Sequence, residues 1–287
     1  MRFGWLNSNH TYETDSVKIS VLDDFQEAIA KVTKSSNQDG EWFYPPITCS
    51  SAGLSVPASR YELPFTHLIS QKKQPENEKF IQFIILYFGW LNGVRLNPEG
   101  WGHLNKSAIK LGSLVDFVVY EQRMPLLLTK GEEFWQTHQH DQLADTMFGA
   151  IHWYFFAHSY THYFERFMAQ YMVMDTLYKI TSVAFSEKEG THAKRIEFIS
   201  KKLNLFCPTW GSVVGKDTEI AGIRNNLLHE SKFAGMAIGF NYEQSHSHIL
   251  LELEAFNCRV IAALMGARGD YSQSSCQTRQ RHAFDFN

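Results

Sequence analysis

Glu219-Ile-Ala-Gly-Ile-Arg-Asn-Asn-Leu-Leu-His-Glu230 is the stretch that combines a helical pattern with side chains suited to chemistry. It holds Arg224, two amides at Asn225 and Asn226, and His229. An arginine binds a phosphate through its planar fork of donors and neutralises its charge. A histidine titrates near neutral pH and can transfer a proton. Together these side chains suit metal-free cleavage of an RNA phosphodiester, in which a 2′-hydroxyl is deprotonated and a crowded phosphate is stabilised.

The helical spacing of the motif bears on how its residues can act together. On a helix of about 3.6 residues per turn, Asn225 and His229 share a face, whereas Arg224 lies about 140° away from His229. One helix therefore cannot present Arg224 and His229 on a single flat wall. Two copies packed across a two-fold axis can, with each copy supplying both residues to a shared cleft. The alternative is a surface helix whose arginine pairs with Glu219 or Glu230 and whose histidine has no role.

The motif Arg224-Asn-Asn-Leu-Leu-His229 resembles the Arg-Asn-x-x-x-His signature of HEPN domains, helical bundles found in many prokaryotic ribonucleases. Two further segments of the C-terminal half are similar to parts of that family. The segment 164–178 resembles its long helix, which often carries an acidic residue where Asp175 stands. The segment 260–271 resembles its last helix and closing turn. Ser231 stands where one toxin subgroup has a tyrosine, so the resemblance is to the domain rather than to that subgroup.

The resemblance implies a metal-independent endoribonuclease that acts as a homodimer, because HEPN ribonucleases commonly form their active site at a dimer interface. His229 would serve as general base or acid, and Arg224 would hold the scissile phosphate and stabilise its added charge. Asn225 would hydrogen-bond the phosphate or orient the histidine. Asp175 and Asn226 would support these residues, with Asp175 reaching Arg224 across the bundle. The expected product is a 2′,3′-cyclic phosphate.

Several alternatives remain open beside this reading. Asp175 falls on the apolar face of a helix predicted over 161–185, and it could equally be a core carboxylate satisfied by tyrosine or histidine donors. The main functional alternative is a non-catalytic HEPN-type module that binds RNA, a nucleotide or a partner protein. The family also implies a role in prokaryotic anti-phage defence, as an abortive-infection or toxin-like effector. In that case a regulatory protein partner could silence the site.

Composition excludes few classes but sets useful bounds. The chain of 287 residues is 44% hydrophobic and 20% charged, which is ordinary for a globular protein. A net charge of −3 gives no global case for nucleic-acid binding, although a local basic cleft can exist on such a chain. Four scattered cysteines without a CxxC pair indicate a reducing, cytoplasmic setting. The most apolar run, 80–91, is too short to span a bilayer, so we expect no membrane association.

No cofactor or metal ion is expected from the motifs present. His158 and His162 stand four apart on a predicted helix, but Ser159 occupies the place of the glutamate in an HExxH site. The basic pairs at 194–195 and 201–202 could track an RNA backbone or simply form a solvated face. Phosphate-loop and dinucleotide-binding motifs are absent from the sequence.

The pattern of the chain changes near Lys130 and Gly131. Residues 1–130 read as a smaller mixed α/β domain, a possible sensor or partner-binding region, with a strand at 17–21 and a helix at 78–92 ended by Gly93. Residues 131–272 read as a HEPN-like helical bundle, which makes the fold class mainly α. Its helices are predicted near 143–155, 161–185, 191–204, from 216 or 217 through the motif, and near 243–265. Residues 273–287 read as a mobile polar tail.

Overall fold

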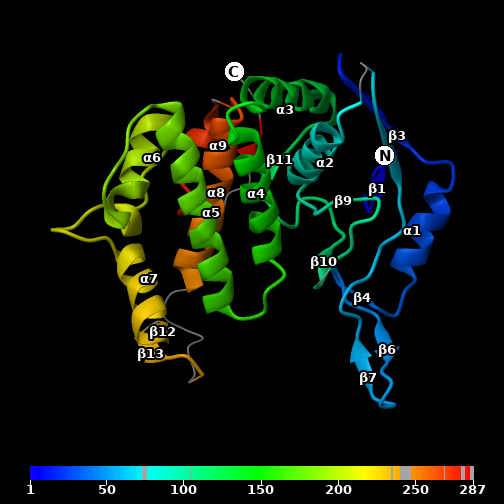
Figure 1. Cartoon of the computed structure of the whole chain (residues 1–287), viewed down its shortest axis with the longest axis horizontal. Helices are drawn as coiled ribbons and strands as arrows, with labels where there is room; N and C mark the ends of the chain where they lie inside the picture. The colour runs from blue at the N-terminus through cyan, green and yellow to red at the C-terminus, as the bar shows by residue number, and fades with distance from the viewer. Residues whose placement is uncertain are drawn as a thin grey trace. The chain divides into compact units, whose positions relative to one another are not determined.

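The computed structural model describes residues 1–72, 76–103, 105–233, 235–239, 247–267, 269–278 and 282–284 (Figure 1). It divides the chain into two compact units. Unit 1 comprises residues 1–115 and 119–137, and unit 2 comprises residues 116–118 and 138–287. The predicted boundary at Lys130 and Gly131 falls inside a helix, Met124–His138, that belongs to unit 1 up to its last residue.

Unit 1 is built around a five-stranded antiparallel sheet with the strand order β2-β3-β8-β1-β9. The strands are β1 Arg2–Gly4, β2 Tyr12–Glu13, β3 Val17–Val21, β8 His67–Gln71 and β9 Asn97–Pro98. The predicted strand at 17–21 is confirmed as β3, which pairs along its whole length with β8. Its alternate residues Val17 and Ile19 are fully buried, as the period-2 pattern requires.

Helix α2, Glu78–Asn92, packs against β8 and β9 and is buried nearly all round. The prediction of this helix is confirmed at both ends. The side chain of Asn77 caps the first turn by accepting from the amide of Phe80 at 3.1 Å. Gly93 ends the helix in the left-handed region at φ 62°, where a Cβ would come within 2.6 Å of the Cα of Gly112. The apolar run that is too short for a membrane span is therefore a core helix.

The remaining elements of unit 1 are several short pieces and one further long helix, α3. They are α1 Phe25–Thr33, β4 Gln38–Asp39, β5 Trp42–Phe43, β6 Ile47–Cys49, β7 Ser55–Pro57, β10 Ser107–Ala108, the 3-10 turn η1 Glu121–Arg123 and α3 Met124–His138. A second buried cluster joins Trp5, Val32, Phe43, Tyr61, Leu63 and Ile109. Unit 1 is thus mixed α/β, as its sequence pattern indicates.

Unit 2 is mainly helical, so the coarse fold class is confirmed. Its helices are α4 Leu143–Ala157, α5 Tyr163–Ala184, α6 Arg195–Leu203, α7 Glu219–Glu230, α8 Ser247–Leu264 and α9 Asp270–Gln273, with 3-10 turns η2 His192–Lys194 and η3 Thr209–Gly211. Helix α5 contacts α4, α6, α7 and α8, which makes it the centre of the unit (Figure 1). Each predicted helix has its counterpart, although residues 243–246 at the start of the predicted 243–265 helix lie outside the described residues.

The last described residues of the chain depart from the predicted polar tail. Strand β14, His282–Ala283, pairs in parallel with β11, Phe117–Val118, and Phe284 is only 1% exposed. The Phe284 ring lies 4.6 Å from the ring of Phe117, centroid to centroid. Apolar burial of Phe284 holds this segment in place. Residues 279–281 and 285–287 of the predicted tail lie outside the described residues.

A buried polar network fastens the same region. The guanidinium of Arg259 on α8 is 1% exposed and donates to Asp116 at 2.6 Å and to the backbone oxygen of Ser274 at 2.9 Å. The hydroxyl of Tyr271 donates to the other Asp116 oxygen at 2.6 Å. These bonds satisfy a charge that would otherwise be costly to bury. They tie α8, α9 and the segment before β11 together.

A further finding concerns the lengths and polarity of the helices. No helix in the described ranges combines the length and the apolar character that a membrane span requires.

A small hairpin, β12 Lys232–Phe233 with β13 Met236–Ala237, follows α7 and packs against it.

Candidate functional site

Helix α7 presents the Arg–Asn–His motif in a defined orientation. The hydroxyl of Thr218 caps its first turn by accepting from the amide of Ala221 at 3.3 Å. The side chains of Ile220, Ile223 and Leu227 are buried, so this side of α7 packs against the rest of unit 2. The helix ends at Ser231, which adopts a left-handed conformation at φ 51°.

The guanidinium of Arg224 is oriented by its neighbour. Its Nη1 donates to Oδ1 of Asn225 at 2.8 Å, and both side chains are partly buried. Asn225 therefore holds the arginine within one chain, whereas the sequence suggested contact with the phosphate or the histidine. Glu230, one of the two predicted surface partners, bonds Lys232 at 2.7 Å instead. Within the described ranges Arg224 forms no ion pair, so its charge is not neutralised there.

His229 and Asn226 lie on the accessible side of α7. Both residues are exposed. Across the part of the chain that the structure describes, no hydrogen bond or ion pair involves the His229 side chain or joins it to Arg224. One copy of the chain thus leaves the histidine imidazole available to a ligand or to a second copy.

Asp175 of α5 has partners other than the predicted Arg224. Its Oδ1 accepts from Nη1 of Arg195 at 2.6 Å, and its Oδ2 lies 3.7 Å from Nδ1 of His192. The Arg195 guanidinium also lies over the ring of Tyr178, 4.7 Å from its centroid. The carboxylate on the apolar face of α5 is therefore satisfied mainly by an arginine that begins α6. In the described residues no bond joins Asp175 to Arg224.

His192 belongs to the same group of side chains, and the sequence reasoning did not identify it. Its Nδ1 lies 3.3 Å from the Tyr171 hydroxyl, and the two rings stack with centroids 6.2 Å apart. Partial burial lowers the pKa of His192, and the positive charges of Arg195 and Arg224 lower it further, while Asp175 opposes the change. A neutral imidazole at neutral pH is able to accept a proton. We name Tyr171, Asp175, His192 and Arg195 the α5–α6 cluster.

Helix α7 contacts both α5 and η2, and the positive charge of Arg224 acts to lower the pKa of both His192 and Tyr171. The cluster could not be read from spacing, because its members come from α5, η2 and α6. The only local signal was the basic character of the segment that begins at residue 194. That segment is partly neutralised, since Lys202 pairs with Glu187 as Arg195 does with Asp175.

The two histidines considered for a metal site have other contacts. Nδ1 of His158 lies 2.8 Å from the backbone oxygen of Tyr154, and its Nε2 lies 3.7 Å from Glu254. Glu254 in turn accepts from Arg166 at 2.6 Å. His162 lies at the start of α5. Within the described ranges no three histidine, cysteine or acidic side chains gather as metal ligands would.

The candidate site thus consists of Arg224, Asn225 and the exposed His229 on α7, with the α5–α6 cluster beside Arg224. Comparison with known proteins adds no family to this geometry: no family model, no curated protein and no solved structure matches the chain.

Proposed function

We propose that this protein is a HEPN-type, metal-independent endoribonuclease whose site is built on α7. The observation that supports it most is the state of Arg224. Its guanidinium is oriented by Asn225 and has no carboxylate partner within the described residues. An oriented arginine with an uncompensated charge is suited to bind a phosphate, because the phosphate supplies the missing anion and matches the donor fork.

The proposed chemistry needs two proton transfers. One His229 imidazole removes the proton from a ribose 2′-hydroxyl, and the resulting oxygen attacks the adjacent phosphorus. Arg224 stabilises the added negative charge on the phosphoryl oxygens. The bond to the 5′-oxygen breaks, and that oxygen takes a proton from a second histidine. The products are a 2′,3′-cyclic phosphate and a free 5′-hydroxyl.

A homodimer supplies the second histidine in this proposal. Leu228, beside His229, is 46% exposed, and Met236 and Ile238 after α7 are 42% and 37% exposed. The backbone of Ile238 bonds that of Ser231, which holds this apolar segment next to the end of α7. Exposed apolar side chains around a site are typical of a surface that a partner covers. A second copy packed there would bring two arginines and two histidines together.

A second candidate function is binding of RNA or a nucleotide without cleavage. It is favoured by one observation: within the described part of the chain, nothing holds the His229 ring in one orientation. A binding module needs the Arg224 charge but not a positioned proton donor. The resemblance to abortive-infection proteins extends either proposal to anti-phage defence, with unit 1 as a sensor or a site for a regulatory protein.

The test is cleavage of total RNA in excess EDTA by wild type and by Arg224→Ala, His229→Ala and His192→Gln. His248→Ala is the matched control, because His248 is an exposed histidine of α8 outside the site. We expect cyclic-phosphate ends from wild type and His248→Ala, and a loss of about 100-fold or more in the Arg224 and His229 variants. A comparable loss in His192→Gln would place a proton-transfer role within one chain rather than across a dimer.

The other outcomes separate the two candidates. RNA binding without cleavage, abolished by Arg224→Ala and retained by His229→Ala, would favour the binding module. Cleavage that EDTA abolishes would refute the metal-free chemistry. Size-exclusion chromatography with light scattering measures the dimer directly, and a monomer with full activity would refute the shared cleft.

A further inference from the structure

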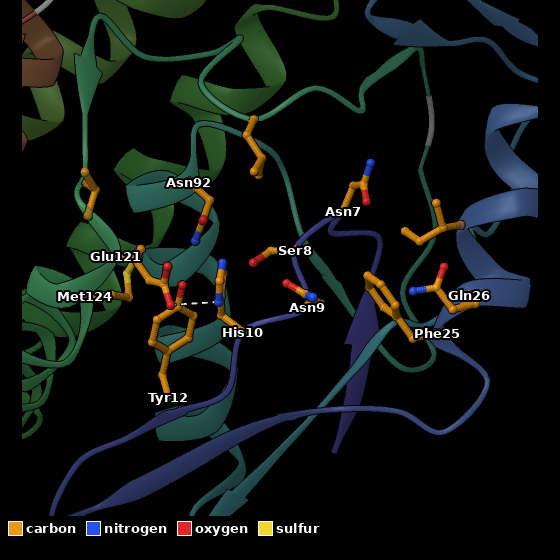
Figure 2. Close-up of a pocket in the computed structure, with 13 residues that line it drawn as sticks. Asn7, Ser8, Asn9, His10, Tyr12, Phe25, Gln26, Asn92, Glu121 and Met124 are labelled. Atoms are coloured by element: carbon orange, nitrogen blue, oxygen red, sulfur yellow. Dashed lines mark ion pairs between the residues drawn. The ribbon is translucent and has the colours of Figure 1, made fainter.

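Unit 1 contains a cavity of about 430 Å³ that the proposed function does not use (Figure 2). It lies where the segment after β1 meets α1, the end of α2 and the turn η1. Four carboxamide side chains line it, Asn7, Asn9, Gln26 and Asn92. The volume falls within the range of about 300–1,000 Å³ that is usual for small-molecule sites.

The carboxamides are available to a ligand. In the described ranges the side chains of Asn7, Asn9 and Gln26 form no hydrogen bond, and all three residues are exposed. Asn92 donates from Nδ2 to the backbone oxygen of Phe88 at 2.8 Å, which leaves its Oδ1 free to accept. A carboxamide offers donors and acceptors side by side. The cavity therefore presents paired hydrogen-bonding groups from three separate elements.

The charges of the lining disfavour an anionic ligand. His10 and Glu121 form an ion pair, Nδ1 to Oε1 at 2.7 Å, and no lysine or arginine is among the described residues that line the cavity. A phosphate placed here would meet the Glu121 carboxylate without an unpaired cation to offset it. Because Nδ1 of His10 faces the carboxylate, its other ring nitrogen is left to meet a ligand. Figure 2 shows His10 and Glu121 joined in this way at one side of the cavity.

Apolar side chains complete the lining. Phe25, Ile29, Leu111, Val119 and Met124 supply hydrophobic surface between the polar groups. A flat heterocycle can lie against such surface while its edge pairs with amides. A saccharide, which carries hydroxyl groups around its whole rim, would have to bury some of them against these side chains without hydrogen-bond partners.

We propose that this cavity binds an uncharged nucleoside. Carboxamides pair with the donor and acceptor edge of a nucleobase through two adjacent hydrogen bonds. The Ser8 hydroxyl and the Glu121 carboxylate, which also line the cavity, suit the ribose hydroxyls. The inference is independent of the ribonuclease proposal, because it concerns unit 1 and is tested by binding rather than by RNA cleavage.

The test is a calorimetric titration of the full chain with adenosine, guanosine, cytidine and uridine, beside adenosine 5′-monophosphate and glucose. Asn9→Ala and Gln26→Ala remove exposed lining amides, and we expect each to weaken nucleoside binding about tenfold, the loss of one good pair. Gln82→Ala is the matched control, because Gln82 lies on α2 outside the cavity and its side-chain amide donates to Glu78 at 3.0 Å. It should bind as wild type does.

Charge reversal at the cavity gives a second readout. Glu121→Lys changes an exposed side chain, so the fold should tolerate it. The variant should shift preference from nucleoside toward the monophosphate by about tenfold or more. The proposal is overturned if wild type binds no nucleoside at millimolar concentration, prefers the monophosphate or glucose, or binds nucleoside equally after Asn9→Ala and Gln26→Ala.

Discussion

Acidification should destabilise unit 1 strongly, because two of its histidines are buried as neutral rings. His67 is 0% exposed and stacks on Phe3 with ring centroids 5.5 Å apart. His103 is 1% exposed and stacks on Tyr61 at 5.4 Å. Burial lowers the pKa of His67 to about 4 and that of His103 to about 3, from an ordinary value of about 6.5.

The direction in which the unfolding free energy changes with pH follows from which state, folded or unfolded, binds more protons. Below about pH 6.5 both histidines take up protons in the unfolded chain, whereas in the folded unit they stay neutral down to their lowered pKa values. Stability is therefore fully present above about pH 6.5 and falls as the pH drops toward 4. At about pH 4.5, two units below the unfolded pKa, each histidine costs about 2.7 kcal/mol, or about 5 kcal/mol together. That is comparable with the whole free energy of unfolding of many domains, about 5–15 kcal/mol.

The assay is urea unfolding at pH 7 and 4.5, with amide hydrogen exchange in α2 as the reading specific to unit 1. His67→Gln and His103→Gln should each remove about half of the pH-dependent loss, although both lower the stability at pH 7. His10→Gln is the control, because the side chain of His10 is 43% exposed in the same unit, and this variant should keep most of the wild-type loss. The reasoning is refuted if wild type loses less than about 1 kcal/mol between the two pH values, or if all three variants keep the wild-type slope.

Three ion pairs of unit 2 give further predictions. Asp175→Asn should lower the unfolding free energy by about 1–2 kcal/mol, because its 2.6 Å pair with Arg195 is only 20–30% exposed at either end. Glu187→Gln breaks the pair with Lys202, whose carboxylate is 59% exposed, and should lower the unfolding free energy by about 0.5 kcal/mol or less. Equal melting temperatures of Asp175→Asn and Glu187→Gln would contradict this difference. Asp116→Asn should cost about 2–4 kcal/mol, because the buried guanidinium of Arg259 loses its counter-charge. Limited proteolysis should then cut the C-terminal segment faster. An unchanged digestion rate would show that the bonds of Asp116 to Arg259 and Tyr271 do not hold this segment in place.

Much of the fold was predictable because its signals are local. Helix α2 was predicted over its full length, since an apolar run and Gly93 mark its body and its end in one stretch. Strand β3 was predicted from the alternation of Val17, Ile19 and Val21 with polar residues. The helices of unit 2 were placed to within a few residues for the same reason.

The partners of single side chains were not predictable. The position of Asp175 on an apolar face indicated that this carboxylate needs a partner, but periodicity fixes only the face of a helix. Which donor it meets depends on how α5 packs against α6, and the structure pairs it with Arg195. His192 was missed for the same reason. The segment at 282–284 carries no local strand signal. It pairs with β11, which stands more than 160 residues earlier in the chain, and a pattern within one stretch of sequence does not indicate such a distant partner.

The pairing of β11 with β14 has a consequence for the order in which the chain folds during synthesis. Unit 1 uses residues up to 137, apart from the three of 116–118, so its core can close while the ribosome is still making unit 2. Phe117 and Val118 have to wait for residues 282–284 before their strand is complete. During that interval the backbone of residues 116–118 has no strand beside it and can pair with other chains. Chaperone capture of nascent chains stalled between residues 140 and 280 should therefore centre on this short segment, although unit 1 has already folded.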